Sequence, residues 1–303
     1  MRVVVTGHTG FVGKNLLAHI AMQGAADVAC VTLPDSFDLC SETAIDEALE
    51  GLEFDHVLHL AAQSHVPTSV ADPVGTFDTN VMGTVRLLRA LQKRAFAGRF
   101  LYVSSGDVYG IVDSASLPVT ERTQPRPANP YAASKLAAEV VALTWGQMKA
   151  FDVIVARPFN HLGPGQRTDF AVARFADAVA RIKLGLTPPH LGTGRLDVTR
   201  DFLDVRDVAD AYVALLHSGR AGEIYNVCSG VERGLDAVLD ELIEQSGVAV
   251  EHSIDSALVR PVDLPRMVGS ASRLKADTGW ESKISFADTL REVLTHQLRT
   301  HRS

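Results

Sequence analysis

The chain has 303 residues, of which 46% are hydrophobic and 21% charged, the composition of an ordinary globular protein. A formal net charge of −7 without a basic stripe or arm argues against a nucleic-acid partner, and no apolar stretch approaches the ~20 residues of a membrane span. Three scattered cysteines without metal-ligand spacing indicate reduced thiols and no metal site. The N-terminus enters a strand-like run directly, so we expect a cytoplasmic protein without a signal peptide.

Six short apolar runs recur along the chain, and turn signals and helical patterns separate them. Continuous apolarity is typical of strands that are buried on both faces, as in a parallel sheet. The alternation of strand and helix predicts an α/β fold with a doubly wound, Rossmann-type parallel sheet. The predicted strands are Arg2–Thr6, Val28–Leu33, His56–Ala61, Phe100–Ser104, Val153–Arg157 and Glu223–Val227. The predicted helices between them are Lys14–Met22, Thr79–Lys93 and Tyr131–Lys149.

From about Asn160 this regularity weakens. HLGPGQ has loop chemistry, and Thr187–His190 is a proline-rich turn. We predict helices at Phe170–Leu184, 234–247 and 284–299, and a strand followed by a turn at Thr199–Val208. The pattern predicts a smaller C-terminal substrate lobe that is interleaved with the sheet. The dinucleotide-binding domain would take residues 1–159 plus about 197–228, and the lobe residues 160–196 and 229–303.

The segment TGHTGFVG (6–13) follows the first predicted strand and opens the first helix. Glycine is needed there because a Cβ would collide with the phosphates of a dinucleotide or with the packed helix. The helix N-terminus adds amide groups and a partial positive charge. A glycine triplet in this strand-turn-helix context predicts a dinucleotide site. Its expected cofactor contacts are Gly7, Gly10, Phe11, Val12 and Gly13.

The tip of the second strand offers little to distinguish the two nicotinamide cofactors. A ribose-binding carboxylate is expected about 20 residues after the glycines, but no acid occurs before Asp35 and no arginine stands there for a 2′-phosphate. We therefore expect NADP(H), with NAD(H) usable as well. Asp38 and Leu39 are candidates to border the adenine. Candidates for the nicotinamide side are Ala61, Ala62 and Asn80, although the two alanines fit plain packing positions equally well.

Tyr131 and Lys135 lie four residues apart at the start of a helix, with Asn129 as N-cap and Pro130 at its first position. They share one helix face. A free phenol has a pKa of ~10 and exchanges protons poorly at neutral pH. A neighbouring ammonium, together with an oxidised nicotinamide ring, stabilises phenolate and lowers that pKa. We predict that Tyr131 is the catalytic acid/base, supported by Lys135, which would also hold the nicotinamide ribose.

The fourth predicted strand ends in SSGDVYG (104–110), at the edge of the sheet where ligands collect. Ser105 is a candidate to hydrogen-bond a substrate carbonyl oxygen beside Tyr131, which would polarise the carbonyl for hydride attack. The alternative for Ser105 is an ordinary turn residue. Asp107 is a candidate substrate contact, but we favour a role in capping the following turn.

TGHTGFVG, SSGDVYG and NPYAASK (129–135) resemble the extended short-chain dehydrogenase/reductase family, the nucleotide-sugar epimerases and dehydratases. The resemblance runs the length of the chain. Its later segments most resemble the GDP-6-deoxy-4-keto-mannose reductases of that family, which make GDP-D-rhamnose. These segments are ARPFNHLGPGQ (156–166), DVTRDFLDVRDVADAY (197–212), YNVCSG (225–230) and the RPVDLPR…GW block (260–280).

The resemblance implies roles for individual positions. Ser105, Tyr131 and Lys135 fill the family's catalytic places, and the three glycines fill its cofactor loop. Pro158 and Asn160 would flank the nicotinamide and the sugar. Arg200 and Arg260 lie where the family binds the nucleotide diphosphate.

The reaction is expected to be reduction of the 4-keto group of a GDP-6-deoxy-4-keto-hexose. The family's dehydratases place a Glu two residues after this Ser and often an acid one residue after, where this chain has Asp107 and Gly106. A 4,6-dehydratase or a 4-epimerase on the same scaffold is the alternative. A non-catalytic dinucleotide sensor is a second alternative, which the presence of all three catalytic candidates disfavours.

Arginine suits the diphosphate of a GDP-sugar because its planar fork binds phosphate oxygens in pairs. Arg174 and Arg181 lie seven residues apart on one predicted helix and join the two arginines above as candidates, with solvated surface charge as the alternative for each. His161 is a candidate sugar contact. The other histidines, including His59 in a strand, are expected to be structural. The predicted helices 84–93 and 136–149 present apolar stripes. In the family the equivalent helices pair across a two-fold axis, so we expect a homodimer, although these faces could equally be buried within one chain.

Overall fold

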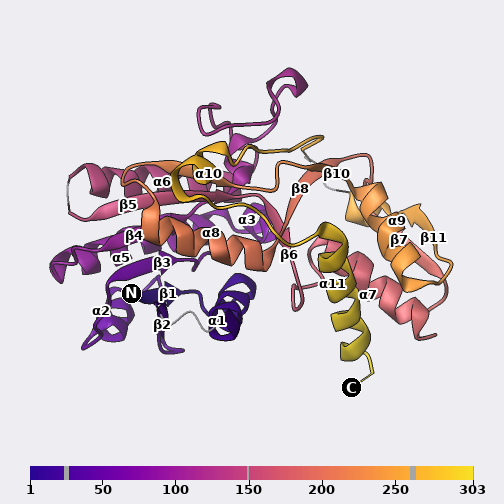
Figure 1. The fold of residues 1–303 in the computed structure, drawn as a ribbon, viewed down its shortest axis with the longest axis horizontal. Helices are drawn as coiled ribbons and strands as arrows, with labels where there is room; N and C mark the ends of the chain where they lie inside the picture. The colour runs from indigo at the N-terminus through magenta and orange to yellow at the C-terminus, as the bar shows by residue number, and fades with distance from the viewer. Residues whose placement is uncertain (24–26, 149, 260–263, 303) are drawn as a thin grey trace.

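The molecule is centred on a six-stranded sheet. The computed structural model describes residues 1–23, 27–148, 150–259 and 264–302. All neighbouring strands of the sheet are parallel, in the order β2-β1-β3-β4-β5-β9 (Figure 1). Every predicted strand is confirmed to within two residues at either end. The strands are β1 Arg2–Thr6, β2 Ala29–Thr32, β3 His56–His59, β4 Arg99–Val103, β5 Asp152–Pro158 and β9 Ile224–Val227.

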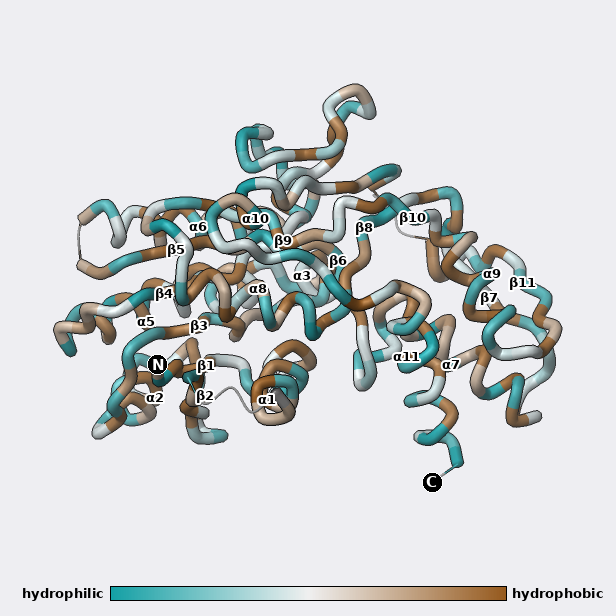
Figure 2. Tube along the Cα trace, viewed as in Figure 1, coloured by the Kyte–Doolittle hydropathy of each residue, from teal (hydrophilic) through white to brown (hydrophobic). Residues whose placement is uncertain are grey.

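Helices cover both faces of this sheet, which explains the continuous apolar runs. Val3 and Val5 of β1 belong to one core cluster and Val4 to the other, because successive side chains of a strand point to opposite faces. The apolar strands are brown in Figure 2, notably at β1 and β3. The first cluster lies under α1 (Phe11–Gln23), α8 (Val205–Ser218) and α10 (Ser272–Thr278), the second under α2 (Glu42–Leu49), α5 (Gly83–Lys93) and α6 (Pro130–Gln147).

Short helical segments join β3 to α5. They are α3 (Val66–Ala71), α4 (Pro73–Phe77) and η1, a π-helical turn at Asp78–Met82. The single helix predicted from 79 to 93 is therefore a π turn followed by α5. This turn faces inward and buries Asn80.

A third apolar cluster is the core of the smaller group of helices and strands on the right of Figure 1. The helices predicted there are confirmed as α7 (Ala171–Lys183), α9 (Leu235–Ser246) and α11 (Phe286–Thr300). The first two residues of the expected loop at 161–166 lie instead in a short strand, β6 (Asn160–Leu162), which pairs with β8 (Thr199–Asp204). β8 also pairs with β10 (Glu232–Gly234). A second small sheet joins β7 (His190–Thr193) to β11 (Glu251–Ile254).

The predicted turn after β8 is wrong, because the chain continues into α8. Asp204 caps this helix by accepting a hydrogen bond from the backbone nitrogen of Arg206 at 2.8 Å. Asp207, inside α8, holds the C-terminal segment by accepting hydrogen bonds from the backbone nitrogens of Lys283 and Ile284. The helix is thus the element that joins the large sheet to α11.

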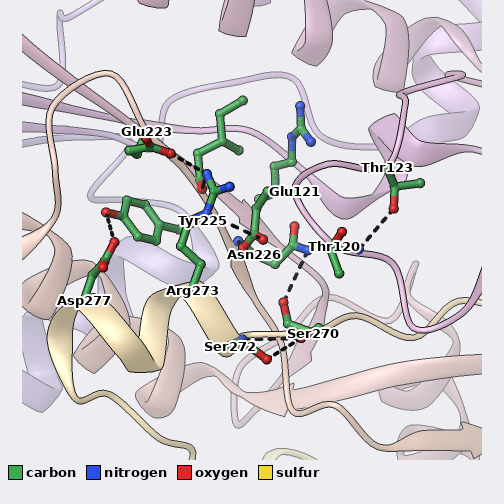
Figure 3. A network of polar contacts seen from close by, with 12 residues as sticks. Thr120, Glu121, Thr123, Glu223, Tyr225, Asn226, Ser270, Ser272, Arg273 and Asp277 are labelled. Carbon is green, nitrogen blue, oxygen red and sulfur yellow. Dashed lines mark hydrogen bonds and ion pairs between the residues drawn. The ribbon is translucent and has the colours of Figure 1, made fainter.

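Residues 111–128 stand out as a loop at the top of Figure 1, between η2 (Gly106–Tyr109) and α6. A polar network ties this loop to β9 and α10 (Figure 3). Glu121 accepts a hydrogen bond from the backbone nitrogen of Asn226 at 2.9 Å, while Arg273 of α10 pairs with Glu223. Tyr225 donates its hydroxyl hydrogen to Asp277 at 2.8 Å. Within the described residues, none of the helices has both the length and the apolarity to cross a membrane.

Candidate active site

One cavity of about 890 Å³ runs across the carboxyl ends of the parallel strands and reaches the smaller group of elements. Ligands of doubly wound sheets collect at this edge. Most predicted site residues line it. They are Gly7, Gly10, Phe11, Val12, Gly13, Asp38, Leu39, Ala61, Ala62, Ser105, Asp107, Tyr131, Lys135, Pro158, Asn160, His161, Arg174 and Arg200.

The glycine loop has no room for side chains at two of its three glycines. Gly7 has φ 71°, and a Cβ on it would lie 2.8 Å from the backbone nitrogen of Ala61. A Cβ on Gly13 would lie 2.5 Å from the carbonyl oxygen of Gly7. Gly10 is different, because it is exposed and a Cβ there would meet only the Gly7 carbonyl oxygen, at 3.2 Å. The loop is therefore closed toward the protein and open toward the cavity, as a backbone cradle for a pyrophosphate requires.

A chain of side-chain hydrogen bonds holds this loop. The hydroxyl of Thr84 donates to the carbonyl oxygen of Asn80, so it accepts from Nε2 of His59 at 3.1 Å. Nδ1 of His59 then accepts from the Thr6 hydroxyl at 2.7 Å, and that hydroxyl accepts from the backbone nitrogen of Ala61. Burial lowers the pKa of His59 to about 3, so the ring is neutral. His59 is structural, as predicted.

Asn80 does not line the cavity, contrary to the prediction. It is 2% exposed because the inward-facing π turn carries it into the protein. Its Oδ1 accepts from the backbone nitrogen of Gln63, and its Nδ2 donates to the Gln63 carbonyl oxygen and to the Ser134 hydroxyl. Gln63 itself lines the cavity. Asn80 therefore shapes the wall after β3 from behind.

The three catalytic candidates come from two elements that meet at the cavity. Asn129 caps α6, as predicted, by accepting from the backbone nitrogen of Ala132 at 2.8 Å, which fixes Tyr131 and Lys135 in the first two turns. Ser105 follows β4. Its hydroxyl oxygen accepts from the backbone nitrogen of Asp107 at 3.1 Å, so its hydrogen can point to a ligand. Ser105 is therefore the N-cap of η2 (Gly106–Tyr109), the turn that contains Asp107.

Burial dominates the acid–base properties of this group. It raises the pKa of Tyr131, nearby Asp107 raises it further, and a hydrogen bond with Ser105 opposes the rise. Burial lowers the pKa of Lys135 to about 7, against an opposing effect of Glu139. The expected lowering of the Tyr131 pKa by Lys135 is not found, because burial sets the direction of the shift and Lys135 is not among the groups that cause it. A raised pKa keeps the phenol protonated, which a proton donor requires.

Two residues that line the cavity have buried hydroxyls without a hydrogen-bond partner among the described residues, and this bears on whether a polar ligand fits there. These residues are Ser104 and Tyr212. Buried polar groups in native proteins are almost always satisfied, so each needs an explanation. Together with the open glycine cradle, they fit a large polar ligand such as a dinucleotide.

The predicted arginines separate into those at the cavity and those elsewhere. Arg174 donates to the carbonyl oxygens of Thr168 and Asp169 at the cavity wall. Arg181 is exposed and does not line the cavity, because seven residues of helix carry it about 10 Å further along α7. Arg260 lies outside the described residues. Two arginines that we did not predict, Arg167 and Arg195, also line the cavity.

His161 connects the substrate side to the glycine loop. Its ring stacks on Phe11, with centroids 6.2 Å apart, and its Nδ1 lies 2.9 Å from the carbonyl oxygen of Phe159. Burial lowers its pKa. A neutral ring between the two halves of the cavity can hydrogen-bond a sugar hydroxyl.

The chain is similar to several characterised proteins. Residues 35–293 match the family model of GDP-mannose 4,6 dehydratase. GDP-6-deoxy-D-mannose reductase of Pseudomonas aeruginosa is 45% identical over 294 residues, which are 97% of this chain and 96% of that protein. The structure of RMD from Pseudomonas aeruginosa with NADPH has a TM-score of 0.93 and 44% identity, and each chain covers 99% of the other. UDP-glucose 4-epimerase of Thermus thermophilus with NAD has a TM-score of 0.84 and 32% identity over 98% of this chain and 99% of that one.

Proposed function

Because the chain belongs to the GDP-mannose 4,6-dehydratase family of extended short-chain dehydrogenases/reductases, we propose that it reduces the 4-keto group of a GDP-6-deoxy-4-keto-hexose with NADPH. The product is GDP-D-rhamnose, which is GDP-6-deoxy-D-mannose. The observation that carries the proposal is that one cavity brings Ser105, Tyr131 and Lys135 together with the glycine loop. NAD(H) is the second cofactor we expect to be usable, since the epimerase above binds NAD.

The side chains supply what a ketone reduction needs. When bound, the cofactor provides a hydride for the carbonyl carbon. The Ser105 hydroxyl, whose oxygen accepts from the Asp107 amide, donates to the carbonyl oxygen. Tyr131 gives its phenol proton to the same oxygen, which completes the alcohol, and the Lys135 ammonium stabilises the phenolate left behind. The amides that open α1 would hold the pyrophosphate, and Lys135 the nicotinamide ribose.

A packing feature after Ser105 favours reduction over dehydration. A Cβ on Gly106 would lie 3.1 Å from the ring of Phe159, so this ring occupies the space into which an acid at position 106 would project. Elimination of water from C6 needs additional acid/base groups beside the catalytic ones. Asp107 is the one acid within two residues after Ser105, and it is a methylene shorter than the family's Glu. The chain therefore has the side chains that a ketone reduction needs, and it has fewer acid/base groups after Ser105 than the family's dehydratases use.

We assign the two lobes and the remaining site residues on the same basis. Residues 1–159 and about 197–228 would bind the dinucleotide, and residues 160–196 and 229–303 the substrate, although α10 in the latter range packs against the large sheet. Cofactor contacts are Gly7, Gly10, Phe11, Val12, Gly13, Asp38, Leu39, Ala61, Ala62 and Pro158. Substrate contacts are Asn160, His161, Arg174 and Arg200.

We also propose a cytoplasmic homodimer. The apolar side chains of α5, including Leu87, Leu88 and Leu91, are buried within the chain. Val140 on α6 is 57% exposed and Met82, just before α5, is 46% exposed, and these leave an apolar surface for a second copy. Sedimentation velocity should give twice the mass of 32.6 kDa, and a monomer at micromolar concentrations would contradict this.

The function is tested by NADPH oxidation, followed by absorbance, with GDP-4-keto-6-deoxymannose, and with dTDP- and UDP-ketosugars for comparison. We expect turnover with the GDP-sugar, and GDP-D-rhamnose as the product by chromatography. Conversion of GDP-mannose alone to the ketosugar would replace the proposal by a dehydratase. Cofactor binding without turnover of any ketosugar would favour a dinucleotide sensor.

A further inference from the structure

Tyr212 differs from the other tyrosines in the state of its hydroxyl. It is 0% exposed, and its hydroxyl has no hydrogen-bond partner among the described residues. The hydroxyls of the chain's other four tyrosines all have hydrogen-bond partners. Tyr102 bonds to the carbonyl oxygen of Lys135, and Tyr109 bonds to the side chain of Asn226. Tyr131 bonds to the hydroxyl of Ser105, and Tyr225 bonds to the carboxylate of Asp277 (Figure 3).

An unpartnered hydroxyl in this position costs stability. A phenylalanine would bury the same ring without a polar atom, so a tyrosine is the weaker choice unless something satisfies it. Tyr212 lies on α8 in the apolar cluster that contains Val103 of β4, with Val12 of α1 packed against it. The residue also lines the cavity. The missing partner can therefore be a ligand that enters from the cavity.

The part of the ligand that reaches Tyr212 follows from the chemistry at Tyr131. Hydride and proton are delivered to two adjacent atoms of one carbonyl, so a bound nicotinamide ring must lie beside the Tyr131 hydroxyl. The two phenols are near enough that a charge on Tyr131 raises the pKa of Tyr212, in addition to the larger effect of burial. Tyr212 stays neutral and can both donate and accept a hydrogen bond.

We infer that the hydroxyl of Tyr212 is a cofactor contact, which hydrogen-bonds the carboxamide group of the bound nicotinamide ring. The carboxamide is the polar substituent of that ring, with one acceptor and two donor hydrogens to match a neutral phenol. The inference rests on the proposed function, because it requires a nicotinamide cofactor in this cavity. It adds α8 to the elements that recognise the cofactor.

The test compares Tyr212→Phe with a matched control, Tyr225→Phe. Tyr225 does not line the cavity, and its hydroxyl is satisfied by Asp277 and the backbone nitrogen of Arg220. Three quantities are measured for both variants and the wild type: the melting temperature without ligand, the Kd for NADPH, and the Kd for 2′-phospho-ADP-ribose, which lacks the nicotinamide.

For Tyr212→Phe we expect an unchanged or higher melting temperature without ligand, an NADPH Kd raised about three- to tenfold, and an unchanged Kd for the fragment. Tyr225→Phe should melt at a lower temperature and bind both ligands normally. An unchanged NADPH Kd in Tyr212→Phe overturns the inference, and so does equal weakening of both ligands or a loss of ligand-free stability. A wild type that does not bind NADPH overturns the proposed function, and the inference with it.

Discussion

The ammonium nitrogen of Lys135 lies 4.7 Å from the centroid of the Tyr102 ring. Lys135 is only 4% exposed, so the ring face and the nearby Glu139 replace part of the hydration that the cation loses. The replacement is incomplete, because burial lowers the pKa of Lys135 to about 7. A buried lysine whose charged form is disfavoured to this extent serves the chemistry of Tyr131 more than the fold.

Replacing Lys135 with an uncharged residue should therefore raise the stability of the protein and lower its activity. The folded pKa of about 7 lies below the ~10.4 of an unfolded lysine, so between these values the unfolded state binds more protons and wild-type stability rises with pH. We expect Lys135→Met to melt about 2–4 °C above the wild type at pH 6, with a gap that closes toward pH 10, while kcat falls at least about 100-fold. Melting curves at pH 6, 8 and 10 check this. A variant less stable at every pH would show that the charge stabilises the fold.

Removing the phenol hydroxyl of Tyr131 should stop the reaction without releasing the cofactor. We expect Tyr131→Phe to lower kcat about 10²- to 10⁴-fold, because the proton donor is lost, and to leave the Kd for NADPH within about twofold. Steady-state kinetics and fluorescence titration measure the two quantities, with Tyr225→Phe as a control outside the cavity. Near-normal turnover in Tyr131→Phe would remove it as the acid.

The large sheet and the catalytic group could be predicted from the sequence because their signals are local. Strands covered on both faces are continuously apolar, and Asn129 and Pro130 mark the start of α6. α8 was missed, although Asp204 is a regular N-cap, because β8 continues directly into the helix and the start of the helix resembled a turn.

The walls of the site depend on tertiary contacts, and single residues there were mispredicted. Gln63 belongs to no motif and lines the cavity because buried Asn80 holds its backbone. Arg195 follows β7, a strand that only its pairing with β11 reveals. A hydroxyl without a partner, as in Tyr212, is a property of the folded structure alone.

Two glycines of the loop should respond differently to the same added methyl group. In Gly13→Ala the Cβ meets backbone at 2.5 Å, so we expect the melting temperature to fall by more than about 5 °C. In Gly10→Ala its one near contact is the Gly7 carbonyl oxygen at 3.2 Å, which can be relieved by a small shift, so the melting temperature should fall by less than about 2 °C while the NADPH Kd rises about tenfold. Thermal melts and titrations distinguish these effects. If the two variants changed the melting temperature equally and the NADPH Kd equally, Gly10 would not face the pyrophosphate.

Two arginines on α7 offer a matched test of the substrate side. Arg174 lines the cavity, whereas Arg181, two turns further along the same helix, is exposed and outside it. If Arg174 binds the diphosphate of the GDP-sugar, Arg174→Met should raise the KM for the ketosugar about tenfold, with kcat and the NADPH Kd nearly unchanged. Arg181→Met removes the same charge from the same helix and should alter none of the three. The net charge of the two variants is identical. A KM that rises equally in both would therefore indicate long-range attraction of the substrate instead of a direct contact with Arg174. Raising the ionic strength would then abolish the difference between each variant and the wild type.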